Sequence, residues 1–528
     1  MATGFLKHSV RERRELILHG SPLRVILLLS LPTVMMAFVA SLIPMTDGLF
    51  LNNAGNHIVA SAVGYCNPVI NMLGALGQGL ATAVTAMLGQ TYGQGDMNAV
   101  RHMSLQVIVF AIVLALGVGP VCIIAGRVLS NGLSDPELAS GVFLYLSLHF
   151  FILPFHFLAA VFNAIKNATG QPEATFYRMT ILLVSKLVFN IIFLSLLNLG
   201  VLGAILATLA SYFVISVWMY YDLFVQVSEM RLELRGFRFD WALLGRLMKL
   251  GVPVMLSTAL INVGFFLINQ EVVAYGTVVF TAQTIAGNIN SLTFTIPSSI
   301  GTTITTIVSI NVAAKQVERA KRSFHIALGV AVVLGLVLTA LFLLLAGPFV
   351  SLYLQNPDMD PALRAEIYDF AVGAVNIYTA STIGFALFMA AQGAFIGLGR
   401  TRLPLFGGLL RIWLFRYIFI LLFQEQLGVY AVFYGNLFSN YASGIIFYII
   451  LMRTDWSQGL MDNLKQKRSR LTWRFPSRVR ERIGAFRPLP ERSGSPLPGA
   501  GNGEQVPGDD KTGSDEQAAG NDKTGSDG

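Results

Sequence analysis

One acidic residue stands inside the first long apolar segment of the chain. Asp47 follows Ile43-Pro44-Met45-Thr46 and is the only acid in that segment. A charge at membrane depth costs about 2.5–3.5 kcal/mol on insertion scales, so such a residue normally faces a cavity and has a function. Desolvation favours the neutral form of a carboxyl group, which suits a group that binds and releases a proton. We expect Asp47 to do this, and the alternative is a solvated acid that ends the segment.

Two prolines precede Asp47 in the same segment. Pro44 removes the helix hydrogen bond to the carbonyl of Ala40, and Pro32 has the same effect deeper in the segment. The sequence therefore predicts helix kinks at Pro32 and Pro44, on the approach to the acid.

Further polar side chains lie within later apolar segments, and together they predict a wet cavity or hydrogen bonds between helices. The residues expected to line the cavity are Asn67, Asn71, Gln78, Asn262, Glu271, Gln283 and Asn288. For Glu271, a wetted helix end is an equal alternative. Lys186 and Arg416 could pair within the cavity or extend to the inner headgroups, and for Lys186 we favour the headgroups.

The composition indicates which elements hold these side chains. Of 528 residues, 54% are hydrophobic and 12% are charged, whereas a soluble domain carries about 25% charge. This predicts an all-α integral membrane protein and excludes a cytosolic enzyme, a disordered regulator and a disulfide scaffold. Continuous apolar runs also exclude an outer-membrane barrel. Nucleotide, metal and hydrolase motifs do not occur in the sequence, so we expect no enzyme, no metal, no cofactor and no nucleic-acid partner.

Twelve segments are long enough to span a bilayer, which needs about 20 apolar residues. They lie near residues 25–50, 58–88, 104–125, 141–162, 180–198, 201–221, 247–270, 281–311, 326–347, 370–396, 408–424 and 429–452.

Basic residues fall on alternate loops. If the N-terminus is cytoplasmic, the inner loops hold 19 Lys and Arg and the outer loops hold Arg127 and Arg364. Because inner loops carry the positive excess, both termini are predicted in the cytoplasm of a protein in the inner (plasma) membrane.

The sequence indicates two copies of a six-segment unit. Four short motifs recur in order at offsets of 221, 220, 229 and 228 residues, beginning with Leu31-Pro32 and Val252-Pro253. Parallel repeats are typical of secondary transporters. We expect a cytoplasmic N-terminus at 1–24, an N-terminal lobe at 25–222, a cytoplasmic loop at 223–246 and a C-terminal lobe at 247–453. A basic and then disordered tail follows at 454–528.

Several motifs over about residues 21–452 resemble the multidrug and toxic compound extrusion (MATE) family. They include Asp47-Gly48-Leu49-Phe50, Gly170-Gln-Pro172, Gly200-Val-Leu-Gly203 and Gly399-Arg-Thr401. The resemblance implies twelve helices in two pseudo-symmetric lobes with a V-shaped opening. It also implies export of organic compounds, often cationic or aromatic, in exchange for protons or sodium.

The same resemblance assigns ion-coupling roles. Asp47 falls on the acid of the family's first span, and Asn190 falls on the Asn of its Asn-x-x-x-Asp pattern. This chain has Leu194 where many members have the Asp. Since a hard cation prefers several oxygen ligands, we expect H+ rather than Na+ as the coupling cation. The expected partners are a small organic substrate, the coupling cation and the lipid bilayer, for a monomer.

One alternative stays open within the same superfamily. A flippase for lipid-linked oligosaccharides or lipids would favour a cavity rich in Arg and Lys for phosphate.

Overall fold

The computed structural model describes residues 9–457, except 53–56, 227–228, 236 and 355–359. The chain divides into Met1–Lys467 and Arg468–Gly528. The predictions for the tail beyond residue 457 lie outside the described residues.

Helices make up the first half of the chain. After the short helix α2 (Val10–His19), the long helices follow with two π-helical segments, η1 and η2. They are α3 (Pro22–Asn52), α4 (His57–Gln94), α5 (Met97–Val118), α6 (Pro120–Asn131), α7 (Pro136–Ala168), α8 (Pro172–Asn190), η1 (Ile191–Leu196), α9 (Gly200–Tyr220) and η2 (Tyr221–Val225).

The second half repeats this plan. Its elements are α10 (Trp241–Val273), α11 (Thr277–Ala313), α12 (Val317–Leu344), α13 (Ala346–Tyr353), α14 (Pro361–Ala380), α15 (Thr382–Gly397), α16 (Arg402–Leu409), η3 (Leu410–Tyr417), α17 (Ile418–Leu427) and α18 (Tyr430–Met452).

Eleven of these helices or continuous helical runs are long and apolar enough to cross a membrane. The number rises to twelve when α14 and α15, bent by 41° at their junction, count as one span. Each of the twelve predicted segments coincides with one of them. The prediction of an all-helical membrane protein is therefore confirmed.

Local sequence sets where several helices begin. Asp96, Asp135 and Asp240 each accept a hydrogen bond from a backbone N–H in the first turn of α5, α7 and α10. Such caps satisfy N–H groups that have no partner within the helix.

The turns predicted to carry the inner basic residues meet at one end of the bundle, around α2. Arg13 donates to the carbonyl of Gly170 in the α7–α8 turn at 3.0 Å, and Arg14 donates to that of Gly93 at the end of α4 at 2.8 Å. Arg319, which follows the α11–α12 turn, donates to a carbonyl of α2 itself at 3.0 Å. These contacts gather the basic turns on one side, as an even number of spans requires.

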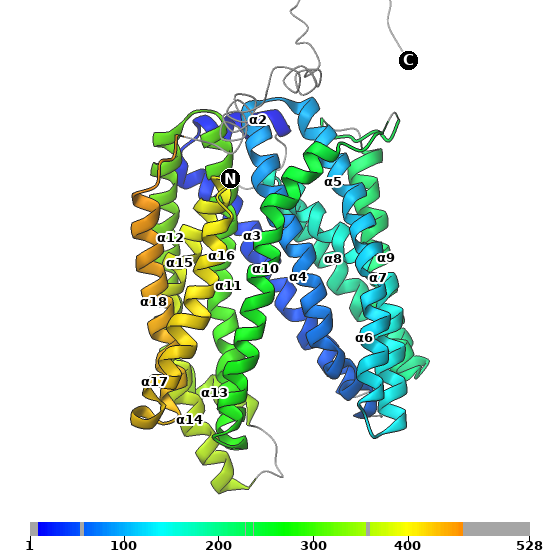
Figure 1. The fold of residues 1–528 in the computed structure, drawn as a ribbon, viewed down its shortest axis with the longest axis vertical. Coiled ribbons are helices and arrows are strands. Elements are labelled where there is room, and N and C mark those ends of the chain that lie inside the picture. Colours follow the sequence, from blue (N-terminus) through cyan, green and yellow to red (C-terminus); the bar gives the residue numbers. More distant parts are fainter. Residues whose placement is uncertain (1–8, 53–56, 227–228, 236, 355–359, 458–528) are drawn as a thin grey trace, which may run out of the picture. The chain divides into compact units, whose positions relative to one another are not determined.

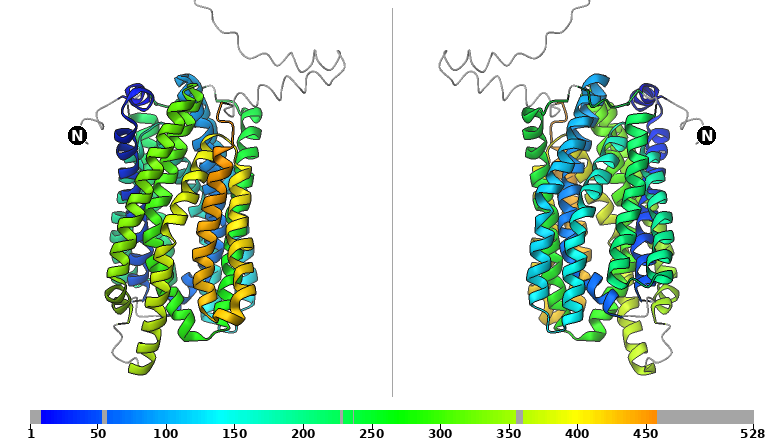
Figure 2. Two further views of the ribbon diagram at one scale, coloured as in Figure 1. Left: turned by 90° about the vertical axis from the view of Figure 1, so that its left-hand side faces the viewer. Right: turned by 90° about the vertical axis from the view of Figure 1, so that its right-hand side faces the viewer.

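Ribbons of the two halves lie close together at the α2 end and diverge toward the other end (Figure 1). Side views show the long helices running along the same axis (Figure 2). Within the first half α4 packs on α7, within the second α15 packs on α11 and α18, and between the halves α4 packs on α10 and α11.

Backbone geometry repeats between the halves at the offsets found in the sequence. Three turns of the first half contain a residue with positive φ, and the matching turn of the second half contains one too. The pairs are Gly95 and Lys315, Gly170 and Gly399, and Gly200 and Gly428. A π-helical segment also interrupts the fifth span of each half, as η1 and η3. Matching irregularities at matching places support a duplicated six-helix unit.

Glycines allow close helix packing inside the second half, and one of them gives a stability prediction. A Cβ on Gly393 of α15 would collide with the carbonyl oxygen of Gly301 in α11. The same contact brings the Thr305 hydroxyl to the Gly393 carbonyl at 3.0 Å. We expect Gly393→Ala to lower the free energy of unfolding by about 1–3 kcal/mol, measured by thermal melting in detergent.

A matched control is Gly329→Ala in α12, where nothing lies within 4 Å of the added atom. Its melting temperature should stay equal or rise slightly, because alanine favours helix more than glycine does. Equal melting of the two variants would contradict the close approach of α11 and α15.

Candidate functional site

The carboxylate of Asp47 is bound by two side chains of α8. Its Oδ2 lies 2.5 Å from Nζ of Lys186, and its Oδ1 accepts a hydrogen bond from Nδ2 of Asn190 at 2.9 Å. The lysine side chain is 9% exposed and that of Asp47 is 24% exposed. Such a pair is weakly screened by solvent, so each partner depends strongly on the other.

A cavity of about 320 Å³ adjoins this pair. Asp47, Lys186 and Asn190 contribute polar groups, and Asn67 of α4 and Tyr145 of α7 complete one side. Six elements thus converge there, because Ala204 and Thr208 of α9 and Leu194 of η1 also line it. The space is large enough for several water molecules.

Helix geometry explains why α8 supplies two groups to one acid. Lys186 and Asn190 are four residues apart and therefore share a face of the helix. The regular helix ends at Asn190 and the π-helical η1 begins directly after it. Single π-helical turns are frequent at functional sites.

The expectation that Lys186 reaches the inner headgroups is wrong. The residue is buried and ion-paired with Asp47, which lies near the end of α3 remote from α2. The sequence analysis assigned Asn190 and Asp47 to the same ion-coupling site. Lys186 lies four residues before Asn190 and so on the same helix face, which is the sequence signal that could have indicated its pairing with Asp47.

The two prolines predicted to kink the first span lie inside one helix, and three of the predicted cavity residues lie outside the Asp47 cavity. Pro32 and Pro44 both lie inside α3, which continues as one helix through them. Asn71, Gln78 and Asn262 are exposed. None of the three lines the cavity beside Asp47, and their roles stay predictions.

A second cavity, of about 500 Å³, lies within the second half and contains other predicted residues. Gln283 and Asn288 of α11 line it together with Arg411 and Arg416 of η3. Glu271 lies close by in α10, where it accepts a hydrogen bond from the Tyr417 hydroxyl at 3.3 Å. The sequence analysis singled out Arg416 of this segment but not Arg411, five residues earlier in η3.

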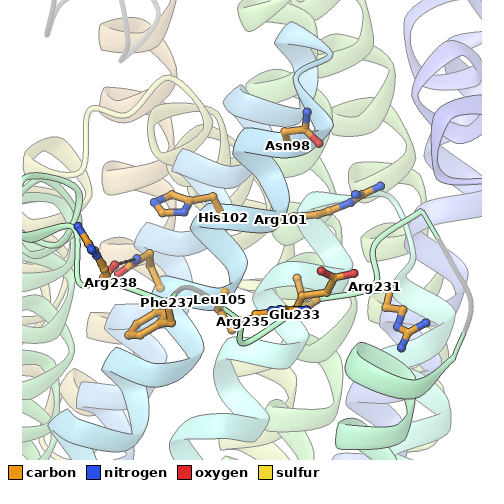
Figure 3. A pocket seen from close by; sticks show the side chains of 11 residues that line it. Asn98, Arg101, His102, Leu105, Arg231, Glu233, Arg235, Phe237 and Arg238 are labelled. Atoms are coloured by element: carbon orange, nitrogen blue, oxygen red, sulfur yellow. Dashed lines mark hydrogen bonds between the residues drawn. The ribbon is translucent and has the colours of Figure 1, made fainter. Parts of the chain in front are cut away.

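A third cavity, of about 280 Å³, lies where the loop before α10 meets α5. Side chains from both elements gather around it, including Arg101 and His102 of α5 and Arg235 and Arg238 of the loop (Figure 3). Gln106 holds the loop in place, since its side chain donates to the Arg238 carbonyl at 2.5 Å. The cavity belongs to the basic turns at the α2 end.

Comparison with known proteins places the two halves in one family. The family model for MatE matches residues 32–192 and again residues 253–422. One match lies in each half, both end before the sixth span of that half, and together they cover more than half of the chain.

Curated relatives have low but extended identity. Multidrug resistance protein MdtK of Pectobacterium atrosepticum is 26% identical over 289 residues, which is 53% of this chain and 63% of that protein's length. A probable multidrug resistance protein NorM of Rhizobium meliloti is 26% identical over 381 residues, or 70% of this chain and 79% of that protein.

Solved structures share the fold. A crystal structure of a MATE protein in complex with MaL6 has a TM-score of 0.78 at 21% identity, covering 83% of this chain and 97% of the other. A MOP superfamily transporter from Pyrococcus furiosus has a TM-score of 0.77 at 21% identity, with the same coverage. The helix pattern, the repeated turns and the two family matches agree: the chain belongs to the MatE (multidrug and toxic compound extrusion, MATE) family of multi-pass membrane transporters.

Proposed function

We propose that the protein is a secondary active exporter of small organic compounds that exchanges its substrate for protons. The observation that carries this proposal is the carboxylate of Asp47, held by Lys186 and Asn190 beside a cavity. The names of the relatives, multidrug resistance proteins, support efflux as the direction of transport.

The groups around the carboxylate favour a proton over sodium. Lys186, with its ammonium group 2.5 Å from Asp47, and Asn190 both present N–H donors to the carboxylate, and such donors cannot coordinate a metal cation. Leu194, one turn beyond Asn190, offers no oxygen ligand to the same cavity. A hard cation such as sodium prefers several oxygen ligands, whereas a proton needs only the carboxyl group.

A proton on Asp47 would also weaken the link between two helices. The protonated acid no longer balances the charge of Lys186, so α3 and α8 lose their strongest polar contact. Pro44, three residues before Asp47, has already removed one hydrogen bond of α3. Protonation from the outside would therefore let α3 change shape and release substrate.

The proposed arrangement in the cell is a monomer in the plasma membrane with both termini in the cytoplasm. The basic turns gathered around α2 support this orientation, because positive loops stay inside.

The test uses proteoliposomes loaded with ethidium or norfloxacin, with either a pH gradient or a sodium gradient imposed. We expect the pH gradient to drive efflux of at least one compound in sodium-free buffer. A sodium gradient alone should give only the leak of empty liposomes. Efflux that needs sodium and ignores pH would overturn proton coupling.

A second candidate is flipping of a phosphate-bearing lipid, favoured by the two arginines in the larger cavity. The same proteoliposomes can carry a fluorescent phospholipid that dithionite bleaches from outside. Bleaching beyond half of the label, in excess of protein-free vesicles, would support this candidate over export.

A further inference from the structure

Two arginines of η3 line the cavity of the second half, called the larger cavity below, although they are almost fully buried. Arg411 is 8% exposed and Arg416 is 7% exposed, and both line the space of about 500 Å³. A charge buried without a compensating partner is costly, so a pair of like charges at one cavity calls for an explanation.

Neutral groups hold both guanidinium groups. Arg411 donates to Oδ1 of Asn440 at 3.1 Å, and Arg416 donates to Oδ1 of Asn436 at 3.2 Å and to the Tyr378 hydroxyl at 3.4 Å. The Nε–H of each arginine is buried and has no hydrogen-bond partner within the described part of the chain. Each guanidinium thus keeps unused donors.

Among the described residues, no carboxylate lines the cavity. The elements α11, α15, η3 and α18 contain no Asp or Glu. The two acids of α14, Glu366 and Asp369, lie nine or more residues before Tyr378, which lines the cavity. The acid of α10, Glu271, accepts from Tyr417 instead. By contrast, the buried Lys166 and Lys186 each lie 2.5 Å from a carboxylate.

Correspondence between the halves shows which charge is absent. Asn269 of α10 stands 222 residues after Asp47, and Arg416 of η3 stands 230 residues after Lys186, close to the offsets of the repeat. Asn269 and Arg416 both line the larger cavity. The second half therefore retains a cation in the fifth span but has an amide where the first half has its acid.

Aromatic rings form much of the remaining lining, beside amide and hydroxyl side chains such as those of Gln283 and Asn290. The guanidinium carbon of Arg411 lies 5.3 Å from the ring centre of Phe385, and that of Arg416 lies 5.6 Å from Phe265. Phe280 and Phe294 also line the cavity. These rings stabilise the cations in part and offer flat apolar surface to a ligand.

We propose that this cavity binds an organic anion, in which one carboxylate, sulfonate or phosphate group is joined to a planar apolar body. The anionic group would accept from the free donors of Arg411 and Arg416, since guanidinium groups bind such oxygens through paired hydrogen bonds. The apolar body would lie against Phe265, Phe280 and Phe294. The inference deepens the proposed function by naming a substrate class, but binding at equilibrium needs neither transport nor a coupling cation.

The experiment is calorimetric titration of the full chain in phosphatidylcholine nanodiscs, with 2-naphthoate as the anion and 2-naphthamide as its neutral isostere. We expect 2-naphthoate to bind at least about tenfold more tightly than the amide, because only the anion satisfies the buried cations. It should also raise the melting temperature of the protein. Equal affinity of the two compounds would overturn the proposal even if no variant folds, whatever the result of the proton-coupling test.

Variants locate the site. Arg416→Gln and Arg411→Gln should each weaken 2-naphthoate binding about tenfold or more, while Arg416→Lys should retain part of the affinity. The control is Arg127→Gln, which removes an exposed arginine lying over the Phe143 ring in the first half. Unchanged binding in folded Arg411→Gln and Arg416→Gln would overturn the assignment to this cavity.

A final arm separates two sources of the anion. Replacing half of the phosphatidylcholine by phosphatidylglycerol should leave 2-naphthoate binding unchanged if the occupant is a soluble anion. Competition by phosphatidylglycerol would instead assign the cavity to a lipid headgroup and overturn the soluble occupant.

Discussion

Substitution of Asp47 by asparagine should abolish export driven by a pH gradient, leaving only the leak of protein-free liposomes. Asparagine keeps the size of the side chain and its contact with Asn190, but it cannot carry a proton at any working pH. The measurement is substrate-dependent proton flux in proteoliposomes, followed with a pH-sensitive dye. Because the loss concerns the coupling chemistry itself, we expect it at every substrate concentration.

Stability must be controlled in this experiment, since Asp47→Asn leaves Lys186 buried without a carboxylate. Removal of one partner of a buried pair costs about 3–5 kcal/mol. The double variant Asp47→Asn with Lys186→Gln has no unpaired charge and should melt closer to the wild type, yet it should still lack coupled flux. Coupled flux by the folded double variant would refute the role proposed for Asp47.

Replacement of Lys186 by methionine should destabilise the protein by up to about 3–5 kcal/mol, because the partly buried Asp47 carboxylate then has no cation beside it. The side chain volume is nearly conserved, so packing contributes little to the loss. In a double-mutant cycle with Asp47→Asn, the loss of the double variant should be smaller than that of either single variant, because no unpaired charge remains. The coupling free energy should therefore exceed the larger of the two single losses. Thermal melting of all four proteins in one detergent gives the coupling free energy.

The matched control is Lys166→Met, which breaks another buried ion pair of the first half. Lys166 lies 2.5 Å from Asp222, and its side chain is 7% exposed against 9% for Lys186. We expect a similar loss of stability but no loss of proton-coupled export, because this pair does not line the Asp47 cavity. Strictly additive losses for Asp47 and Lys186 would show that the two charges do not interact in the folded protein.

The two cavities suggest a division of tasks between the duplicated halves. The first half holds an acid and a cation in contact, whereas in the described part of the second half Arg411 and Arg416 have only neutral hydrogen-bond partners. A proton site and an anion site on opposite halves would let one transporter respond to both ligands as the halves move.

Many features of this protein follow from the sequence alone, because they depend on local chemistry. A run of about 20 apolar residues must form a helix in lipid to satisfy its own backbone, so the spans could be located without a structure. The duplication is visible in the sequence as repeated turn motifs. Gly170 and Gly399, for example, have positive φ at matching turns of the two halves. An acid as isolated as Asp47 was recognisable because apolar surroundings make a charge conspicuous.

Only the tertiary structure decided which charges meet. A helix can turn Lys186 toward the headgroups or toward Asp47 with little change in its own energy, and the packing of α8 against α3 made the choice. In the same way, burial of Arg411 and Arg416 at one cavity depends on how η3 packs against α10 and α18. Hydrophobic length fixes that a helix spans the membrane, but contacts with neighbouring helices fix its rotation, and rotation determines which polar groups become partners.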